Sequence, residues 1–367
     1  MIVVAIIQII FSIYIIWKIS TSFDLAANYL TRNMAQGIKG PTINAAASSL
    51  PELIISSMFL FYYKDIEGFS AGYATIIGSS AFNIACIPII SYLFLYYKNK
   101  KVELKIDRDV VVEDTFFLIL SFVILFFGFY FGLNLFISFL LIILYIIYVI
   151  YIYNNRTSRM ESQNIQASSS NSINTKDNSF NLLYSILNLR LFTIIFNNRL
   201  STFSSYFVIL LSVILIGTSC HLLINAVDLI SDFFNINLFF SAFIIVAISS
   251  SIPDTILSVK DAKNGRIIDS FSNAYGSNIF DICIGLGLPL MVYNFMYKSI
   301  SIDSPIDRIG FIGDYFLDDN LFLWSLIMLF FFTLMVSCIY FYRSLNLKTV
   351  MLVLSIYIIF ILLLIIY

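Results

Sequence analysis

Charged residues, histidine and cysteine are scarce in this chain of 367 residues. Only 12% of the residues are charged, and His221 is the one histidine. The four cysteines, Cys86, Cys220, Cys283 and Cys338, lie in apolar segments without CxxC spacing. This pattern supports neither a Cys/His zinc site nor a disulfide framework. The formal net charge of -1 gives no reason to expect a nucleic acid as partner.

Apolar residues dominate instead. The chain is 60% hydrophobic and 17% aromatic, whereas soluble domains are about 45–50% apolar and about 25% charged. We therefore expect an all-α integral membrane protein, in which each helix needs about 20 apolar residues to cross about 30 Å of hydrocarbon. The first apolar run lacks a basic n-region and a cleavage site, which indicates a retained helix. Ten segments are long enough: 3–28, 42–62, 73–97, 111–132, 134–153, 204–231, 238–259, 271–297, 320–342 and 347–366.

A polar run divides these segments into two sets of five. Residues 154–179 are rich in Ser and Asn and have no hydrophobic period, which is typical of a flexible loop. Residues 182–198 are apolar but contain Arg190, and we expect them to lie at the membrane interface. The predicted organisation is a first five-helix repeat (1–153), a loop with an interfacial segment (154–202) and a second five-helix repeat (203–367).

The basic residues predict the orientation. Most Lys and Arg residues fall in the loops after the first, third, fifth, seventh and ninth segments. Cytosolic loops carry this excess, so we expect a cytosolic central loop and two non-cytosolic termini. Because five helices is an odd number, the second repeat must enter the membrane inverted relative to the first.

Two motifs recur, once in each half. SSLPE at 48–52 matches SSIPD at 250–254, and GSSAFN at 78–83 matches GSNIFD at 276–281. A carboxylate near the bilayer centre costs about 2.5–3.5 kcal/mol, so such residues are rarely placed there without a partner. The prolines free backbone carbonyls in the same region, which is tolerated where a helix lines a polar cavity.

These motifs predict a cation site made only of oxygen donors. Ser79 and Asn83, like Ser277 and Asp281, are spaced four residues apart and share one helix face. Oxygen-only shells suit hard cations such as Ca²⁺, Na⁺ and K⁺. The candidate metal-binding residues are Ser48, Ser49, Glu52, Ser79, Asn83, Ser250, Ser251, Asp254, Ser277 and Asp281.

Charge balance favours exchange at such a site. The three carboxylates could hold one Ca²⁺ with one negative charge left over, or three monovalent ions with none. An aspartyl-protease dyad is the enzyme alternative, but it would explain Asp254 and Asp281 only and leave Glu52 and the repeats without a purpose. We therefore expect a transporter with no catalytic residue and no prosthetic group.

Further polar residues have simpler interpretations. Asp24 and Asp228 lie at matching offsets from the repeat acids and could either line the ion path or anchor helix ends. Glu113 and Asp114 are expected to cap the N-terminus of a helix. The acidic run 303–319 is interpreted as solvated surface.

The two motif regions resemble a known family. Residues 40–91 and 241–294 resemble the alpha repeats of the cation/Ca²⁺ exchanger superfamily, and IPDT followed by SNAYGSNIFDICIGLGLP is most similar to the K⁺-dependent Na⁺/Ca²⁺ exchangers. The resemblance implies the sodium/calcium exchanger fold and an antiporter that moves Ca²⁺ against Na⁺ by alternating access. It also implies that Glu52 and Asp254 are the central ligands, that nearby Ser and Asn side chains add oxygens, and that Asp281 goes with K⁺ co-transport.

The chain departs from the family pattern before each proline. Where the family has Gly-Thr-Ser, this chain has Ala47-Ser48-Ser49 and Ser249-Ser250-Ser251. Ca²⁺/H⁺ exchange and a transport-dead cation sensor therefore stay open beside Na⁺/Ca²⁺ exchange. The expected partners are inorganic cations and the lipid bilayer of a plasma or organelle membrane, and the oligomeric state is left open.

Overall fold

The computed structural model is a bundle of long helices. It describes residues 2–30, 32, 38–63, 66–98, 104, 106–163, 182–197, 199–297 and 321–366. Within this part of the chain, nine helices are long and apolar enough to cross a membrane, and a broken pair makes a tenth span. The expectation of an all-α protein with ten membrane spans is thus confirmed.

The first repeat contains the broken span. Its elements are α1 (Ile2–Leu30), the π-helical turn η1 (Gly40–Asn44), α2 (Ala45–Ser48), α3 (Leu50–Tyr63), α4 (Ile66–Lys98), α5 (Arg108–Phe131) and α6 (Leu135–Gln163). The segment from Gly40 to Ser48 meets α3 at an angle of 49°.

The second repeat follows the same order. Two short helices, α7 (Leu182–Leu187) and α8 (Leu191–Phe196), precede it. It consists of α9 (Thr202–Phe234), α10 (Leu238–Ser241), η3 (Ala242–Val246), α11 (Ala247–Ser250), α12 (Ile252–Lys263), α13 (Ile267–Phe280), η4 (Asp281–Leu286), α14 (Gly287–Tyr297), α15 (Leu321–Tyr342) and α16 (Leu347–Ile366).

Two helix ends differ most from the sequence-based expectation. α4 begins at Ile66 rather than residue 73, and α6 runs to Gln163 rather than 153. Hydropathy marks only the apolar part of a helix, so polar turns that continue it are missed. The rest of the predicted loop, residues 164–179, and the acidic run 303–319 lie outside the described residues.

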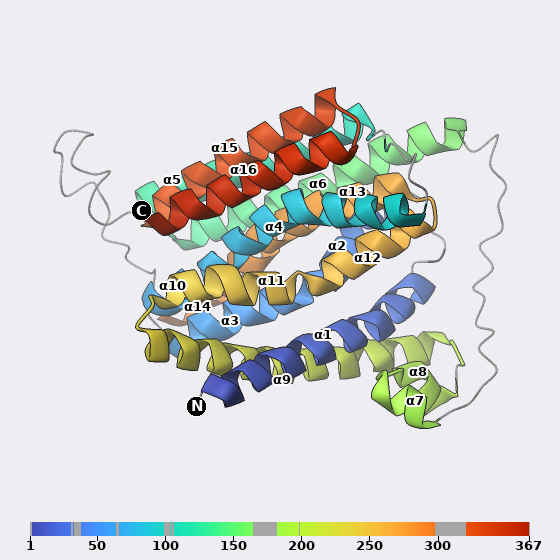
Figure 1. The fold of residues 1–367 in the computed structure, drawn as a ribbon, viewed down its shortest axis with the longest axis horizontal. Helices are drawn as coiled ribbons and strands as arrows, with labels where there is room; N and C mark the ends of the chain where they lie inside the picture. Colours follow the sequence, from blue (N-terminus) through green and yellow to red (C-terminus); the bar gives the residue numbers. More distant parts are fainter. Residues whose placement is uncertain are drawn as a thin grey trace.

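The helices form a peripheral pair and a central bundle. α1 and α9 pack along each other more extensively than any other two helices. Figure 1 shows this pair along one edge of the molecule, with α15 and α16 along the opposite edge and both chain ends at the same end of the bundle. An even number of spans requires both ends to be on one side of the membrane.

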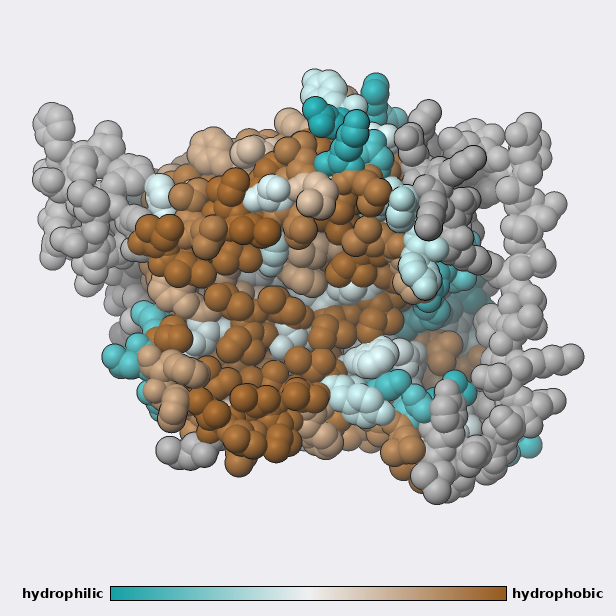
Figure 2. Space-filling model, in the orientation of Figure 1, coloured by the Kyte–Doolittle hydropathy of each residue, from teal (hydrophilic) through white to brown (hydrophobic). Residues whose placement is uncertain are grey.

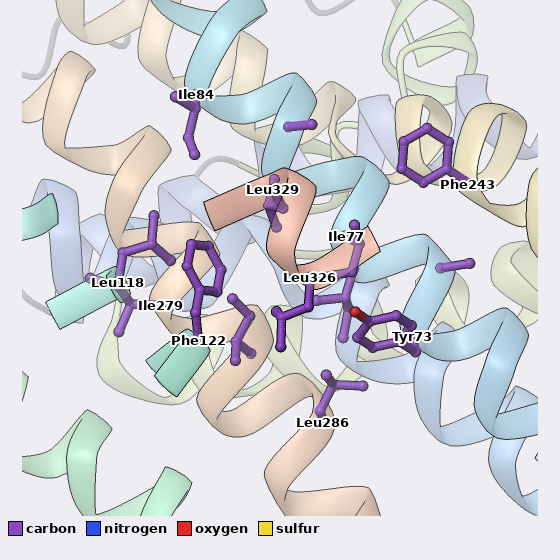
Figure 3. Packing of buried hydrophobic residues seen from close by; sticks show 14 of the residues in the cluster. Tyr73, Ile77, Ile84, Leu118, Phe122, Phe243, Ile279, Leu286, Leu326 and Leu329 are labelled. Carbon is purple, nitrogen blue, oxygen red and sulfur yellow. The ribbon is translucent and has the colours of Figure 1, made fainter. Parts of the chain in front are cut away.

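The centre of the bundle is packed with large apolar side chains. Tyr73 and Ile77 of α4 lie among Phe122 of α5, Ile279 of α13 and Leu326 of α15, as Figure 3 shows. The outer surface is also apolar: brown residues cover most of the face in Figure 2, and teal ones gather toward its ends. Apolar side chains on both the inside and the outside are what a lipid environment requires.

Two glycines bring the repeats together. A Cβ on Gly78 of α4 would lie 2.2 Å from the Phe243 carbonyl oxygen of η3, and one on Gly276 of α13 would lie 2.6 Å from the Pro41 carbonyl oxygen of η1. Each glycine therefore allows a helix of one repeat to touch the backbone of the other. The two crossings are equivalent under the repeat symmetry, and they bring the motif helices into contact.

A buried ion cluster joins α5, α6 and α13. Arg156 forms ion pairs with Glu113 at 3.1 Å and Asp114 at 2.7 Å, and it donates to the Ser272 hydroxyl at 2.8 Å. The predicted capping role of Glu113 and Asp114 is wrong, because the N-cap of α5 is Asp107. Arg156 itself lies within α6 although it was predicted to belong to a loop.

Candidate cation site

All ten predicted site residues are buried in the interior of the bundle, and none of them is more than 4% exposed. They come from equivalent places in the two repeats: the ends of α2 and α11, the first turns of α3 and α12, and the middle of α4 together with the junction of α13 and η4. The inverted repeats thus bring together side chains that lie about 200 residues apart in the sequence.

Each Pro-acid motif begins a half-helix. The chain breaks at Ser49 and Ser251, and Glu52 and Asp254 lie in the first turns of α3 and α12. Pro51 and Pro253 fit this position because the first turn of a helix needs no amide donor. The N-terminal end of a helix carries partial positive charge that stabilises a carboxylate, whereas the C-terminal ends of α2 and α11 attract cations.

Asp254 receives hydrogen bonds from both repeats. The hydroxyls of Ser48 and Ser277 both donate to its Oδ1 atom, the latter at 2.5 Å. Its Oδ2 atom is buried and has no hydrogen-bond partner. One oxygen of Asp254 is therefore positioned by the protein and the other is available to a ligand.

Glu52 has a similar arrangement. The Ser79 hydroxyl donates to its Oε1 atom at 3.3 Å, and Ser79 and Ser251 share a hydrogen bond of 2.9 Å. The Oε2 atom is buried without a partner. Glu52 also lies close enough to Asp254 and Ser250 to interact with them, although the Ser250 hydroxyl donates to the Ala247 carbonyl at 3.2 Å.

Asn83 and Asp281 complete the group and differ from each other. The Asn83 amide donates to Asn278 at 3.0 Å, and its carbonyl oxygen is unpartnered. Both oxygens of Asp281 are buried without a hydrogen bond, although Glu52, Asp254 and Ser49 are near enough to interact with it. The Ser49 hydroxyl is unpartnered as well.

The result is a buried set of free oxygen atoms. Ser49, Glu52, Asn83 and Asp254 each contribute one, and Asp281 contributes two. Among the described residues, no three Asp, Glu, His or Cys side chains converge as a metal-binding group. A single ion in this conformation would therefore combine at most two carboxylates with hydroxyl, amide or backbone oxygens.

Two asparagines of the site were not predicted. Asn278 bridges the repeats, because it accepts from Asn83 and donates to the Ser80 carbonyl at 3.0 Å. Asn273 donates to the Ser258 hydroxyl at 3.0 Å and has an unpartnered carbonyl oxygen. Spacing could have revealed Asn273, because it precedes Ser277 and Asp281 by four and eight residues on the same face of the helix.

Two further acids link the α1/α9 pair to the motif helices. Asp24 of α1 pairs with Lys260 of α12 at 2.5 Å, and Asp228 of α9 accepts from the Tyr63 hydroxyl of α3 at 2.9 Å. Each acid thus contacts the Pro-acid helix of the other repeat. Asp24 and Lys260 also line a pocket that reaches Ser48, so both interpretations of Asp24, anchor and path lining, are compatible with its position.

A cluster of charged residues surrounds the C-terminal end of α12. Asp261 accepts from Arg266 and from the Asn44 amide, the latter at 3.2 Å. Lys39 lies nearby, and partial burial is the main cause that lowers its pKa, against the opposing effect of Asp24. The pocket lined by Asp24 and Ser48 therefore opens beside a region of mixed charge.

Inverted repeats, broken helices and buried carboxylates at the repeat interface are the architecture of a secondary transporter. The chain belongs to the sodium/calcium exchanger family: the family model described as "Sodium/calcium exchanger protein" matches residues 4–154 and 204–366. The expected membership in the cation/Ca²⁺ exchanger superfamily is confirmed.

Curated relatives match over a short stretch. Sodium/potassium/calcium exchanger 2 of Rattus norvegicus is 42% identical over 62 residues, which is 16% of this chain and 9% of the rat protein. The Homo sapiens protein of that name is 44% identical over 54 residues, or 15% of this chain and 8% of its own length. The matched stretches thus span less than a tenth of these relatives.

Solved exchangers match over the whole fold. The crystal structure of the H⁺/Ca²⁺ exchanger CAX has a TM-score of 0.68 at 15% identity and covers 99% of this chain and 86% of its own. The sodium-calcium exchanger NCX_Mj has a TM-score of 0.58 at 19% identity and covers 98% of both chains. These likenesses show the fold, and the expected sodium/calcium exchanger fold is confirmed.

Proposed function

We propose that this protein is a secondary antiporter that exchanges Ca²⁺ for Na⁺ by alternating access at the ten-residue site. The observation that carries the proposal is the set of unpartnered buried oxygens from both repeats, on Ser49, Glu52, Asn83, Asp254 and Asp281. A buried polar group without a partner costs about 1–3 kcal/mol, and more if charged. A hard cation supplies the missing partner.

The proposed roles follow from the contacts. Glu52 and Asp254 hold Ca²⁺ or Na⁺ through the oxygen that no serine occupies, and Ser48, Ser79 and Ser277 fix the other oxygen. Ser49, Asn83, Ser250 and Ser251 complete the oxygen shell. Asp281 adds the third negative charge, and we assign K⁺ co-transport to it.

The proposed orientation follows from the basic loops. The central loop with α7 and α8 faces the cytosol, and both termini face away from it. The pocket lined by Asp24, Ser48 and Lys260 is then the cytosolic approach to the site. Ions reach Asp254 from this side through Ser48, whose hydroxyl contacts it directly.

Flux measurements in proteoliposomes test the proposal. Vesicles loaded with Na⁺ and diluted into Na⁺-free buffer should take up ⁴⁵Ca²⁺, and uptake should increase with K⁺ on the Ca²⁺ side. Uptake that follows a pH gradient and ignores Na⁺ would replace Na⁺ coupling by Ca²⁺/H⁺ exchange. Calorimetric Ca²⁺ binding without flux under any gradient would identify a sensor instead.

Two substitutions in α3 test whether ⁴⁵Ca²⁺ uptake depends on the candidate site. Glu52→Gln removes a charge but keeps the shape, and we expect uptake to fall at least about tenfold, the equivalent of about 1.4 kcal/mol. Ser57→Ala is the matched control, because Ser57 lies on the same helix and bonds only to the Leu53 carbonyl. Its uptake should stay within about twofold of wild type, and equal effects of both changes would contradict the assignment.

A further inference from the structure

A second polar cavity lies at the end of α9, away from α7 and α8. It has a volume of about 420 Å³ and lies between α9, the start of α10, α4 and α15. Its polar lining consists of Ser70, Asp228, Ser231, Asp232 and Asn237. None of these residues belongs to the ten-residue site, so the family function leaves the cavity unexplained.

Two carboxylates in this cavity are placed at an electrostatic cost. Asp228 and Asp232 are four residues apart on α9, and like charges at this spacing destabilise a helix by about 0.2–0.5 kcal/mol. They also lie in its last two turns, at the negative end of the helix dipole. Within the described part of the chain, neither acid forms a salt bridge.

Ser231, which lies between the two acids on α9, has a hydroxyl without a hydrogen-bond partner. This serine is 5% exposed and lines the cavity. Ser219 in the same helix shows the usual alternative, because its hydroxyl donates to the Leu215 carbonyl at 2.8 Å. The Ser231 oxygen is thus buried, unpartnered and next to two carboxylates.

We propose that this cavity is a second cation site that binds a hydrated divalent ion of the Ca²⁺ type. Asp228 and Asp232 neutralise the ion, the Ser231 hydroxyl supplies a further oxygen, and retained water completes a shell of 6–8 oxygens. The cavity has room for several waters at about 30 Å³ each. The Tyr63 hydroxyl holds Asp228 in place from α3.

The site lies on the way to the central carboxylates without overlapping them. Cys220 of α9 touches the Pro51 carbonyl beside Glu52. Asp228 follows eight residues later on the same helix, which is about 12 Å at about 1.5 Å per residue. The two carboxylates attract Ca²⁺ to the face that carries the chain ends and so raise its local concentration there. This consequence rests on the proposed transport function, whereas the binding itself does not.

The first experiment measures binding in purified protein. Tb³⁺ stands in for Ca²⁺, and the phenol of Tyr63 is its sensitiser. The background carries Glu52→Gln, Asp254→Asn and Asp281→Asn, which neutralise the central site. In this background we expect Tb³⁺ luminescence that decreases when millimolar Ca²⁺ displaces the Tb³⁺ ion. Adding Asp228→Asn and Asp232→Asn should reduce this signal at least about fivefold. Asp109→Asn, an exposed acid at the far end of the bundle, is the control and should leave it intact.

The second experiment measures flux in the protein with its central site intact. Asp232→Asn should raise the half-saturating Ca²⁺ concentration about three- to tenfold at unchanged maximal rate, and Asp109→Asn should change neither. The second site would be refuted by two results together: flux of Asp232→Asn equal to that of wild type, and Tb³⁺ luminescence that Asp228→Asn and Asp232→Asn do not reduce. Loss of that luminescence in a protein without any flux would refute the antiporter and leave the second site standing.

Discussion

At the scale of single residues, the repeats differ most at Asn83 and Asp281. The two occupy equivalent positions, but Asn83 lies in the regular helix α4 and is held by Asn278, whereas Asp281 begins the π-helical turn η4 and its side chain has no hydrogen bond. Single π-helical turns are frequent at functional sites. The break in charge symmetry is therefore also a break in backbone symmetry.

Replacement of Asp281 by Asn tests what this asymmetry does. The change makes the second repeat like the first and lowers the number of buried site carboxylates from three to two. We expect K⁺ to lose its effect on ⁴⁵Ca²⁺ uptake while Na⁺-driven uptake persists at a reduced rate. The measurement is uptake against K⁺ concentration, with the Ser57→Ala variant described above as the control. If uptake by Asp281→Asn still depends on K⁺, the assignment of K⁺ co-transport to Asp281 is wrong.

The positions of the ten candidate residues could be predicted because each lies in a short repeated motif, and their role as cation ligands stays a prediction. The burial and grouping of the ten site residues follow from two repeated motifs. Glu113 and Asp114 show the limit, because their partner Arg156 lies more than 40 residues away in a stretch whose composition resembles a loop. Only the fold shows that these charges meet in the interior.

At the scale of elements, close approach of helices depends on two glycines. Gly78 and Gly276 let α4 and α13 touch η3 and η1, as described above. The motif alignment identified both glycines but not their contacts, because spacing along one helix does not reveal which backbone crosses it. Helix ends were missed for a related reason, since tertiary contacts such as that of Arg156 extend α6 beyond its apolar part.

Alanine at these glycines should destabilise the fold. The added Cβ of Gly78→Ala or Gly276→Ala would collide with a backbone carbonyl, and such overpacking costs about 1–3 kcal/mol. Gly217→Ala on α9 is the control, because no atom lies within 4 Å of its added Cβ, and alanine favours a helix by about 0.5–1 kcal/mol. Thermal unfolding in detergent should separate the two classes. Equal midpoints for Gly78→Ala and Gly217→Ala would mean that the crossing tolerates a methyl group.

At the scale of the molecule, the α1/α9 pair meets the rest of the bundle through apolar packing as well as polar contacts. Leu223 of α9 belongs to the main hydrophobic cluster of the bundle, and Phe23 of α1 packs with Ala47 of α2. Ala26 of α1 packs against Val208 of α9 in a small apolar cluster. The ties to the motif helices are Asp24 to Lys260 and Asp228 to Tyr63. The Lys260 side chain is 46% exposed, and such ion pairs contribute only about 0–1 kcal/mol. Because apolar packing is non-directional and the ion pair is weak, the interface is suited to the sliding that the proposed alternating access requires.

Cross-linking distinguishes motion of the α1/α9 pair relative to the rest of the bundle from motion of α1 relative to α9. With Cys338 replaced by serine, Asp24→Cys with Lys260→Cys places one thiol on α1 and one on α12, and Ala26→Cys with Val208→Cys joins α1 to α9. We expect both double variants to transport Ca²⁺ before treatment, because the Asp24–Lys260 ion pair is weak and Ser48, rather than either of these residues, contacts Asp254. A bifunctional thiol reagent should then stop ⁴⁵Ca²⁺ uptake in the α1–α12 variant, reversibly with reductant, and leave uptake in the α1–α9 variant within about twofold. Full transport with α1 fixed to α12 would show that the pair does not slide over the bundle, and the alternation would then have to arise within α3, α4, α12 and α13.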